Sequence, residues 1–359
     1  MYYIKNIVLG IALNSLIICQ SLSTKGILTI SSLTSNDIPK QWSSYQSNIT
    51  YLPTLSLKKE MSSQVLLDFE WGYKLKRDYT GDSLYANVEK QHRLWLRYSN
   101  EKLETRLGLQ KIILGPTQIL RPLSWFDTFD VKDPAGETNG VEAFRLKWFP
   151  SNNISVWSWF IQNKLDTLSY GGRTEISSSF GEFGFTLHLD PSNSKKMIGQ
   201  PGVPINNSHT RTAIDYRYDG FIGFWNESVL IKSDKSNIKM AAIGADYTLP
   251  ILNGILVMTE SMYIQSKYNN IQSNHSFSVF MASIPIGMIH QLMYISQVDW
   301  KEDKTYQYLR WSSTYDAYSL NMIISMNPKR NQYDIPVSSL PKSLSGFGTG
   351  IQFMFIYNH

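Results

Sequence analysis

The chain has 359 residues and a formal net charge of +5, and 42% of its residues are hydrophobic, 13% aromatic and 18% charged. A single cysteine excludes a disulfide framework. Basic residues are interspersed with acidic ones, which argues against a nucleic-acid-binding patch, so no nucleic-acid partner is expected. The 21 Tyr and 10 Trp favour strands with one wet and one apolar side, because no long apolar run follows the N-terminal segment.

The first segment is typical of a secretory signal peptide. Lys5 precedes an apolar run over residues 7–18, and Ser21 and Ser23 are small residues suited to cleavage. The run is too short for a membrane-spanning helix, which needs about 20 residues. We therefore expect a signal peptide over residues 1–23, cleaved near Ser21 or Ser23, which would remove the only cysteine.

Beyond this segment, apolar and polar residues alternate with a period of two, as in residues 65–76 and 347–357. The pattern predicts an all-β fold, a transmembrane antiparallel up-and-down β-barrel over residues 50–359. About 18 strands are expected, with 16 as the alternative. Residues 24–49 are expected to form an N-terminal periplasmic segment with room for one short strand, at residues 26–32.

Connection lengths predict the orientation, because such barrels have short periplasmic turns and longer external loops. Short turns are expected at Asn100, residues 150–152, Gly181, residues 219–220, residues 250–253, residues 285–286 and residues 315–317. Longer loops are expected at residues 78–88, 112–139, 191–209, 267–274 and 327–346.

Residues 106–150 are the most informative stretch, two alternating strands joined by the long loop at residues 112–139. Loops of that length usually carry function or are disordered, and three aromatic residues argue against disorder here. The loop either folds inward and narrows the lumen or forms an external lid. The candidate constriction residues are Arg121, Trp125, Phe126, Asp127, Phe129, Asp130 and Asp133. The aspartates lack the dense spacing of a calcium loop, so no metal is expected.

The neighbouring strands carry charged residues that we expect on the lumen side. The candidate pore-lining residues are Arg93, Arg97, Arg106, Glu104, Glu142, Arg145 and Lys147. A ladder of guanidinium groups would favour anions. Cross-strand salt bridges with acids of the same face, including Asp68 and Glu70, would instead neutralise it. The sequence leaves both interpretations open.

The same region carries a family-like pattern. It contains Arg106-x-Gly108-x-Gln110-x-Ile112, Leu114-Gly115, Arg121-Pro122-Leu123, Asp127-x-Phe129-Asp130, Asp133-Pro134 and Gly140-Val141-Glu142-Ala143-x-Arg145. These motifs resemble outer-membrane porin-like β-barrels related to the alginate-export group. Weaker support comes from Asp219-Gly220, residues 225–227, Gly244-Ala245-Asp246-Tyr247 and Glu260-Ser261-Met262-Tyr263. The resemblance implies the barrel architecture, with the outer membrane of a Gram-negative-type cell as its location.

The expected function is a porin-like channel for passive diffusion of small polar or anionic solutes. A polysaccharide-export or surface-glycan-binding barrel is the alternative. No enzymatic activity is expected, because no catalytic serine or metalloprotease motif occurs. No cofactor is expected. The expected partners are outer-membrane lipid and lipopolysaccharide, a small polar solute, and the barrel-assembly machinery, which would recognise the aromatic final strand.

Overall fold

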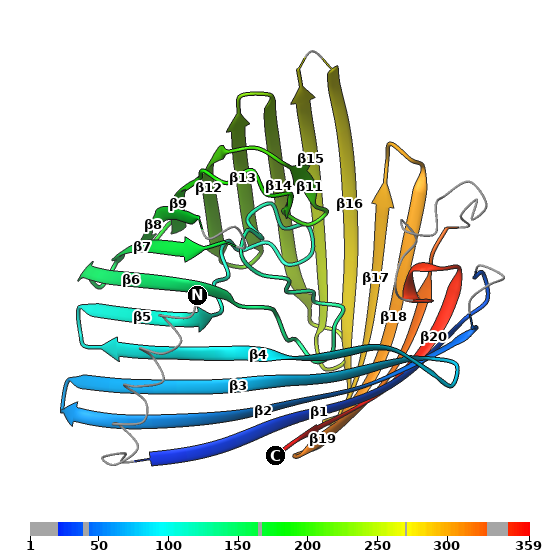
Figure 1. Ribbon diagram of the computed structural model, residues 1–359. Helices are drawn as coiled ribbons and strands as arrows, with labels where there is room; N and C mark the ends of the chain where they lie inside the picture. The colour runs from blue at the N-terminus through cyan, green and yellow to red at the C-terminus, as the bar shows by residue number, and fades with distance from the viewer. Residues whose placement is uncertain (1–20, 39–42, 164–166, 270, 329–343) are drawn as a thin grey trace.

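The computed structural model describes residues 21–38, 43–163, 167–269, 271–328 and 344–359, which form one closed barrel (Figure 1). Its wall is a sheet of 18 strands in which every pairing is antiparallel, so the predicted strand number and fold class are confirmed. The sheet closes where β1 pairs with both β2 and β20. Within the described residues, no helix has the length and apolarity that crossing a membrane would require.

The wall strands differ widely in length. The first nine are β1 (Ser21–Ser35), β2 (Tyr45–Ser62), β3 (Val65–Thr80), β4 (Ser83–Ser99), β5 (Leu103–Gln110), β6 (Val141–Ser151), β7 (Ile154–Gln162), β8 (Leu168–Ser178) and β9 (Gly181–Asp190). The other nine are β12 (His209–Asp219), β13 (Gly223–Ser233), β14 (Ser236–Leu249), β15 (Ile255–Tyr268), β16 (Ile271–Ile286), β17 (His290–Asp299), β18 (Lys304–Thr314), β19 (Tyr318–Met326) and β20 (Thr349–Asn358). A small hairpin, β10 (Lys196–Ile198) and β11 (Val203–Ile205), and a 3-10 turn, η2 (Leu344–Gly346), lie outside the wall.

All the turns predicted to be short lie at one end of the barrel, together with Asn358 at the end of β20. At the opposite end, the connections at residues 111–140 and 191–208 are long, as predicted. The predicted long loops at residues 78–88 and 267–274 are wrong, because β3 and β4 continue to residues 80 and 83, and β15 and β16 to residues 268 and 271. Their polar side chains look like loop sequence, but the backbones remain paired and extend the hairpins.

The two faces of the wall follow strand register. One row across β5 to β8 pairs Leu107 with Phe144, Phe144 with Phe160 and Phe160 with Tyr170, and its aromatic side chains are exposed on the outside. The alternate row on these strands pairs Arg106 with Arg145 and lies on the inside. The period-2 pattern therefore predicts the two faces correctly here.

The N-terminal part of the wall differs from the predicted boundary at residue 50. β1 (Ser21–Ser35) is a full wall strand rather than one short strand in a periplasmic segment, and β2 begins at Tyr45. The alternation in residues 26–32 marks the middle of β1. Serines and threonines on either side break the hydrophobic pattern, so the sequence did not indicate the full length of the strand. The predicted signal peptide stays a prediction, because residues 1–20 lie outside the described residues.

Candidate functional site

The long loop at residues 111–140 folds into the barrel, where it appears in Figure 1 as the cyan to green segment inside the wall. Ile112, Leu114, Leu120 and Leu123 are almost fully buried and belong to one hydrophobic cluster. The wall side of this cluster comes largely from β12 to β17, including Ile231, Met240, Met262 and Ile295. Burial of large apolar side chains, each contributing about 1.5–3 kcal/mol, therefore stabilises the inward position.

Two buried glutamates of the wall bind the backbone of the loop, and the first is Glu227 in β13. It accepts hydrogen bonds from the backbone N–H groups of Thr117, at 3.0 Å, and Leu123, at 2.9 Å. The loop here is irregular, so these donors have no helix or strand partner. Buried backbone donors need partners, and the carboxylate supplies them inside the barrel.

The second is Glu260 in β15. Its carboxylate accepts hydrogen bonds from the backbone N–H groups of Gln118 (2.7 Å), Ile119 (3.0 Å) and Leu120 (2.7 Å). The indole N–H of Trp225 donates to the same carboxylate at 3.1 Å. Three consecutive loop donors thus converge on one side chain, which fixes the turn at residues 118–120 against the wall.

Two glycines make room for these contacts. A Cβ atom at Gly115, whose φ is +78°, would lie 2.0 Å from Oε1 of Glu227. A Cβ atom at Gly244 would lie 2.3 Å from the indole nitrogen of Trp225. Both glycines belong to the sequence motifs that carry the family resemblance. Glycine is needed at these two positions because a side chain at Gly115 would collide with Glu227 and one at Gly244 would collide with Trp225.

A second loop, at residues 191–208, is hydrogen-bonded to the first. Arg121 donates its backbone N–H to the carbonyl of Gln200 at 2.7 Å, and Gln200 donates back at 2.9 Å. Gly199 donates to the carbonyl of Ser124 at 3.2 Å. The buried Arg121 side chain pairs with Asp127 at 2.5 Å. Both of these predicted constriction residues therefore stabilise the loop internally, beside the β10–β11 hairpin, rather than facing a passage.

The predicted aromatic residues are also packed rather than free. The ring of Phe126 lies 5.0 Å from that of His188, centroid to centroid, and 5.8 Å from that of Trp159. Trp159 donates its indole N–H to Nδ1 of His188 at 3.1 Å. The guanidinium of Arg211 lies 5.5 Å from the centre of the Trp125 ring. These contacts attach the middle of the loop to β7, β9 and β12.

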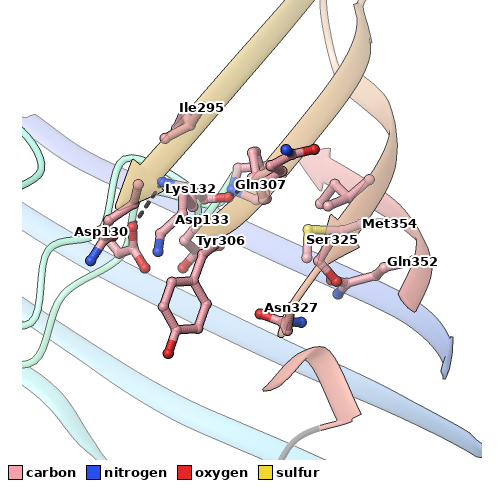
Figure 2. Close-up of a pocket in the computed structure, with 14 residues that line it drawn as sticks. Asp130, Lys132, Asp133, Ile295, Tyr306, Gln307, Ser325, Asn327, Gln352 and Met354 are labelled. Carbon is pink, nitrogen blue, oxygen red and sulfur yellow. Dashed lines mark hydrogen bonds between the residues drawn. The ribbon is translucent and has the colours of Figure 1, made fainter. Parts of the chain in front are cut away.

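Residues 130–133, which we call the loop tip, border the open part of the lumen. A cavity of about 500 Å³ separates Asp130, Lys132 and Asp133 from β17 to β20. Figure 2 shows these three residues on one side and Ser325 and Gln352 on the other. A second cavity, of about 530 Å³, also borders Gln352 and continues along β1 to β4. The open space thus follows the side of the barrel that the loop does not fill.

The loop tip is held at a defined distance from this wall. The hydroxyl of Tyr308 donates to the carbonyl of Lys132 at 2.6 Å. Among the residues that line the first cavity, Lys132 carries a positive charge and Asp130 and Asp133 carry negative ones. Desolvation raises the pKa of Asp133, and the nearby Asp130 raises it further, against a backbone hydrogen bond from Ala135. Phe129 lies behind the tip, with its ring 5.4 Å from the guanidinium of Arg121.

The basic ladder forms a salt-bridge lattice. Glu104 lies 2.7 Å from Arg145 and 3.5 Å from both Arg97 and Arg106. Arg97 also pairs with the buried Asp68. Each guanidinium of the three therefore has a carboxylate partner, which is the neutralising arrangement that the sequence left open. The ladder lies on β4 to β6, whereas the loop tip faces β17 to β20.

The remaining pore-lining candidates have separate positions. Arg93 donates to the carbonyl of Thr138 at 2.7 Å and so holds the returning end of the loop. Lys147 lies 4.2 Å from the centre of the Trp157 ring. The assignment of Glu142 to the ladder face is wrong. It pairs in register with Leu109 and lies three positions before Arg145 in the same strand, so its side chain projects from the opposite face.

Burial tends to raise the pKa of Glu137 at this end of the loop. A hydrogen bond with His92 at 2.9 Å, with the nearby charge of Arg93, outweighs that effect and lowers the pKa below its ordinary value. The carboxylate is therefore stabilised next to β4.

Among the described residues, no group of three or more His, Cys, Asp and Glu side chains is placed to hold a metal ion.

Sequence reasoning missed the most important acids, Glu227 and Glu260. Both lie within segments that gave weaker support to the family resemblance. The available signal was an acid on a strand whose other lumen-facing positions are apolar, such as Val229 and Ile231 beside Glu227. Such an acid needs buried partners, and irregular loop backbone can supply them.

No protein-family model matches the sequence, and no curated protein matches it. Solved structures do match. OccK2 (OpdF) of Pseudomonas aeruginosa superposes with a TM-score of 0.63 at 6% identity, covering 95% of this chain and 98% of that one. OccD3 (OpdP) of the same organism gives 0.59 at 7% identity, covering 95% and 91%. The anion-selective porin from Comamonas acidovorans gives 0.50 at 12% identity, covering 94% and 99%. The chain therefore has the fold of outer-membrane porins.

Proposed function

We propose that this protein is an outer-membrane channel for passive diffusion of small polar solutes. The observation that carries the proposal is the polar space left between the loop tip and β17 to β20. The loop fills the part of the lumen next to β12 to β17 and leaves the other part open. An inward loop that narrows a wide barrel selects solutes by size without closing it. The porin neighbours support the same function.

Selectivity for charge should be weak. The sequence predicted polar or anionic solutes, and the three arginines of the ladder would attract anions if they were unpaired. Glu104 and Asp68 offset much of that charge. Around the loop tip, polar uncharged groups such as Gln297, Ser325 and Gln352 predominate. Small neutral polar solutes are therefore the substrates that the lining suits best, and small anions should pass as well.

The environment of the barrel is part of the proposal. Exposed aromatic side chains on the outer face, such as Phe160 and Phe353, suit contact with lipid. We place the protein in the outer membrane of a Gram-negative-type cell after signal-peptide cleavage near Ser21 or Ser23. Lipid, lipopolysaccharide and the barrel-assembly machinery are its proposed partners. We propose no catalytic activity.

The glycan-export alternative needs aromatic side chains that line the passage. Trp125, Trp159 and Trp225 are buried between loop and wall, where a glycan has no access to them. The aromatic side chains that line the cavity at the loop tip are Tyr306 and Tyr308, and the hydroxyl of Tyr308 is already bound to the loop. The specific likeness to the alginate-export-related group rests on the motifs in residues 106–145. In the structure those motifs serve to seat the loop, so they bear on channel shape rather than on substrate.

Reconstitution in planar bilayers tests the proposal. The refolded mature chain should give discrete conductance steps and a reversal potential close to zero in a salt gradient. Liposome swelling should be faster with small neutral sugars than with oligosaccharides. A correctly folded barrel, shown by slower migration on a gel after boiling, that gives no conductance and no swelling would refute the channel function.

A further inference from the structure

One part of the rim at the short-turn end is unusually apolar. Four neighbouring turns join β8 to β9, β12 to β13, β14 to β15 and β16 to β17. Their tips carry Phe180, Phe221, Leu252 and Met288, which are 76%, 82%, 81% and 94% exposed. We call these four turns the apolar rim. Turn tips are usually built from polar residues and glycine, so this departure calls for a partner.

The rest of the same rim is polar. The turns between β2 and β3 and between β4 and β5 are joined by a hydrogen bond of 2.8 Å from Gln64 to Glu101. Lys102 follows in the second of these turns, and Asn152 and Asn153 form the turn between β6 and β7. In contrast, the turn residues 179–180, 220–222, 250–254 and 287–289 include no charged side chain. Among the described turns at this end, large exposed apolar residues at the tip are therefore confined to one arc of the barrel, although Met61 at the end of β2 is also exposed.

We propose that the apolar rim is immersed in the lipid leaflet at this end of the barrel, so that this arc lies deeper in the bilayer than the polar arc. At the turn that carries Phe221, the rim continues the outward face of the wall. The ring of Phe221 lies 5.0 Å from that of Tyr247 in β14, and exposed Phe183, Tyr218 and Phe224 lie on the adjoining strands.

The charged residues of these hairpins point the other way. Arg217 shares the row of Trp225, which faces the lumen, and it pairs with Asp219 at 2.9 Å. The outside of the arc therefore offers aromatic and aliphatic groups without fixed charge, the composition that suits the boundary between headgroups and acyl chains. The proposal requires insertion into a bilayer, but it does not depend on whether the barrel conducts.

Nitroxide labels at single cysteines test the immersion. Phe221→Cys, Leu252→Cys and Met288→Cys would be labelled in the full chain carrying Cys19→Ser and reconstituted in phosphatidylethanolamine and phosphatidylglycerol vesicles. Lys102→Cys and Asn153→Cys on the polar arc are the matched controls. We expect the ratio of collisions with oxygen to collisions with a water-soluble nickel chelate to be several-fold higher at the three apolar tips than at the controls.

Equal ratios at all five positions would overturn the proposal, because the apolar rim would then lie no deeper than the polar arc. Shielding of the three tips from both reagents, with dipolar broadening that disappears on dilution with unlabelled chain, would also overturn it in favour of a second copy of this chain. Three separate tips keep the test decisive if one variant fails to fold. The labelling experiment reports the depth of the turns, whereas conductance reports the channel. Refutation of the immersion would therefore leave the proposed channel function untouched.

Discussion

Replacing Glu260 with Gln should loosen the inward loop. Each oxygen of the Glu260 carboxylate accepts two hydrogen bonds, Oε1 from Gln118 and Trp225 and Oε2 from Ile119 and Leu120. A carboxamide keeps one acceptor oxygen, so two of the four bonds are lost in either orientation. The Trp225 bond lies within the wall, so the orientation that keeps the Ile119 and Leu120 bonds removes a single bond to the loop. At about 1.5–3 kcal/mol for a bond to a charged group, the loop is then held less strongly by about that amount. That corresponds to a factor of ~10–10² in the equilibrium between seated and released loop.

Single-channel recording shows the effect directly. The Glu260→Gln channel should conduct more on average and with larger current fluctuations, because the loop leaves its seat from time to time. Glu104→Gln is the matched control, since it removes one lumen carboxylate whose arginine partners lie on the wall. Both variants should keep the heat-modifiable migration of a folded barrel. Conductance and noise of Glu260→Gln equal to those of the parent and the control would refute the reasoning.

Three further outcomes are expected. Deleting residues 122–134 should raise conductance several-fold in planar bilayers, and unchanged conductance would mean that the loop does not limit the passage. Phe353→Arg, on the outer face, should cost about 2–4 kcal/mol in urea unfolding from vesicles if it lies near the bilayer midplane, whereas Gln352→Arg, on the lumen face, should cost much less. Equal costs would invert the face assignment. Because the pKa of Asp133 is raised, acidification should neutralise it at a higher pH than an ordinary aspartate and shift the reversal potential toward anion preference. Asp133→Asn should abolish that shift, and a variant with the parent's pH profile would contradict the assignment.

The barrel itself was predictable from the sequence because a wall between lipid and water imposes a period of two. Residues 65–76 and 347–357 show that period, and residues 65–76 and 349–357 lie in wall strands with the expected outer faces. The eighteenth strand was indicated by residues 26–32 alone, since the rest of β1 is rich in serine and threonine. Backbone pairing does not require apolar side chains, so polar strand ends leave little signal in the hydrophobic pattern.

The loop destination could not be predicted, because it depends on distant partners. Leu120 and Leu123 are apolar in any conformation, but their burial requires an apolar patch on the lumen wall. That patch makes β13 and β14 look lipid-facing on both sides, as Ile231 and Met240 illustrate. Whether the arginines of the ladder are neutralised could not be predicted either. Glu104 contacts all three only because of how the side chains are oriented across neighbouring strands.

The seat of the loop also sets an order of events during assembly. The glutamates that bind the loop come much later in the chain, Glu227 by 110 and 104 residues and Glu260 by 140 to 142 residues. Until β13 and β15 are in place, the loop has no acceptors and its leucines stay in water. We therefore expect the loop to seat only after β15 has joined the wall, while β16 to β20 still have to be added before β1 pairs with β20. The passage can then be narrowed before the barrel is closed.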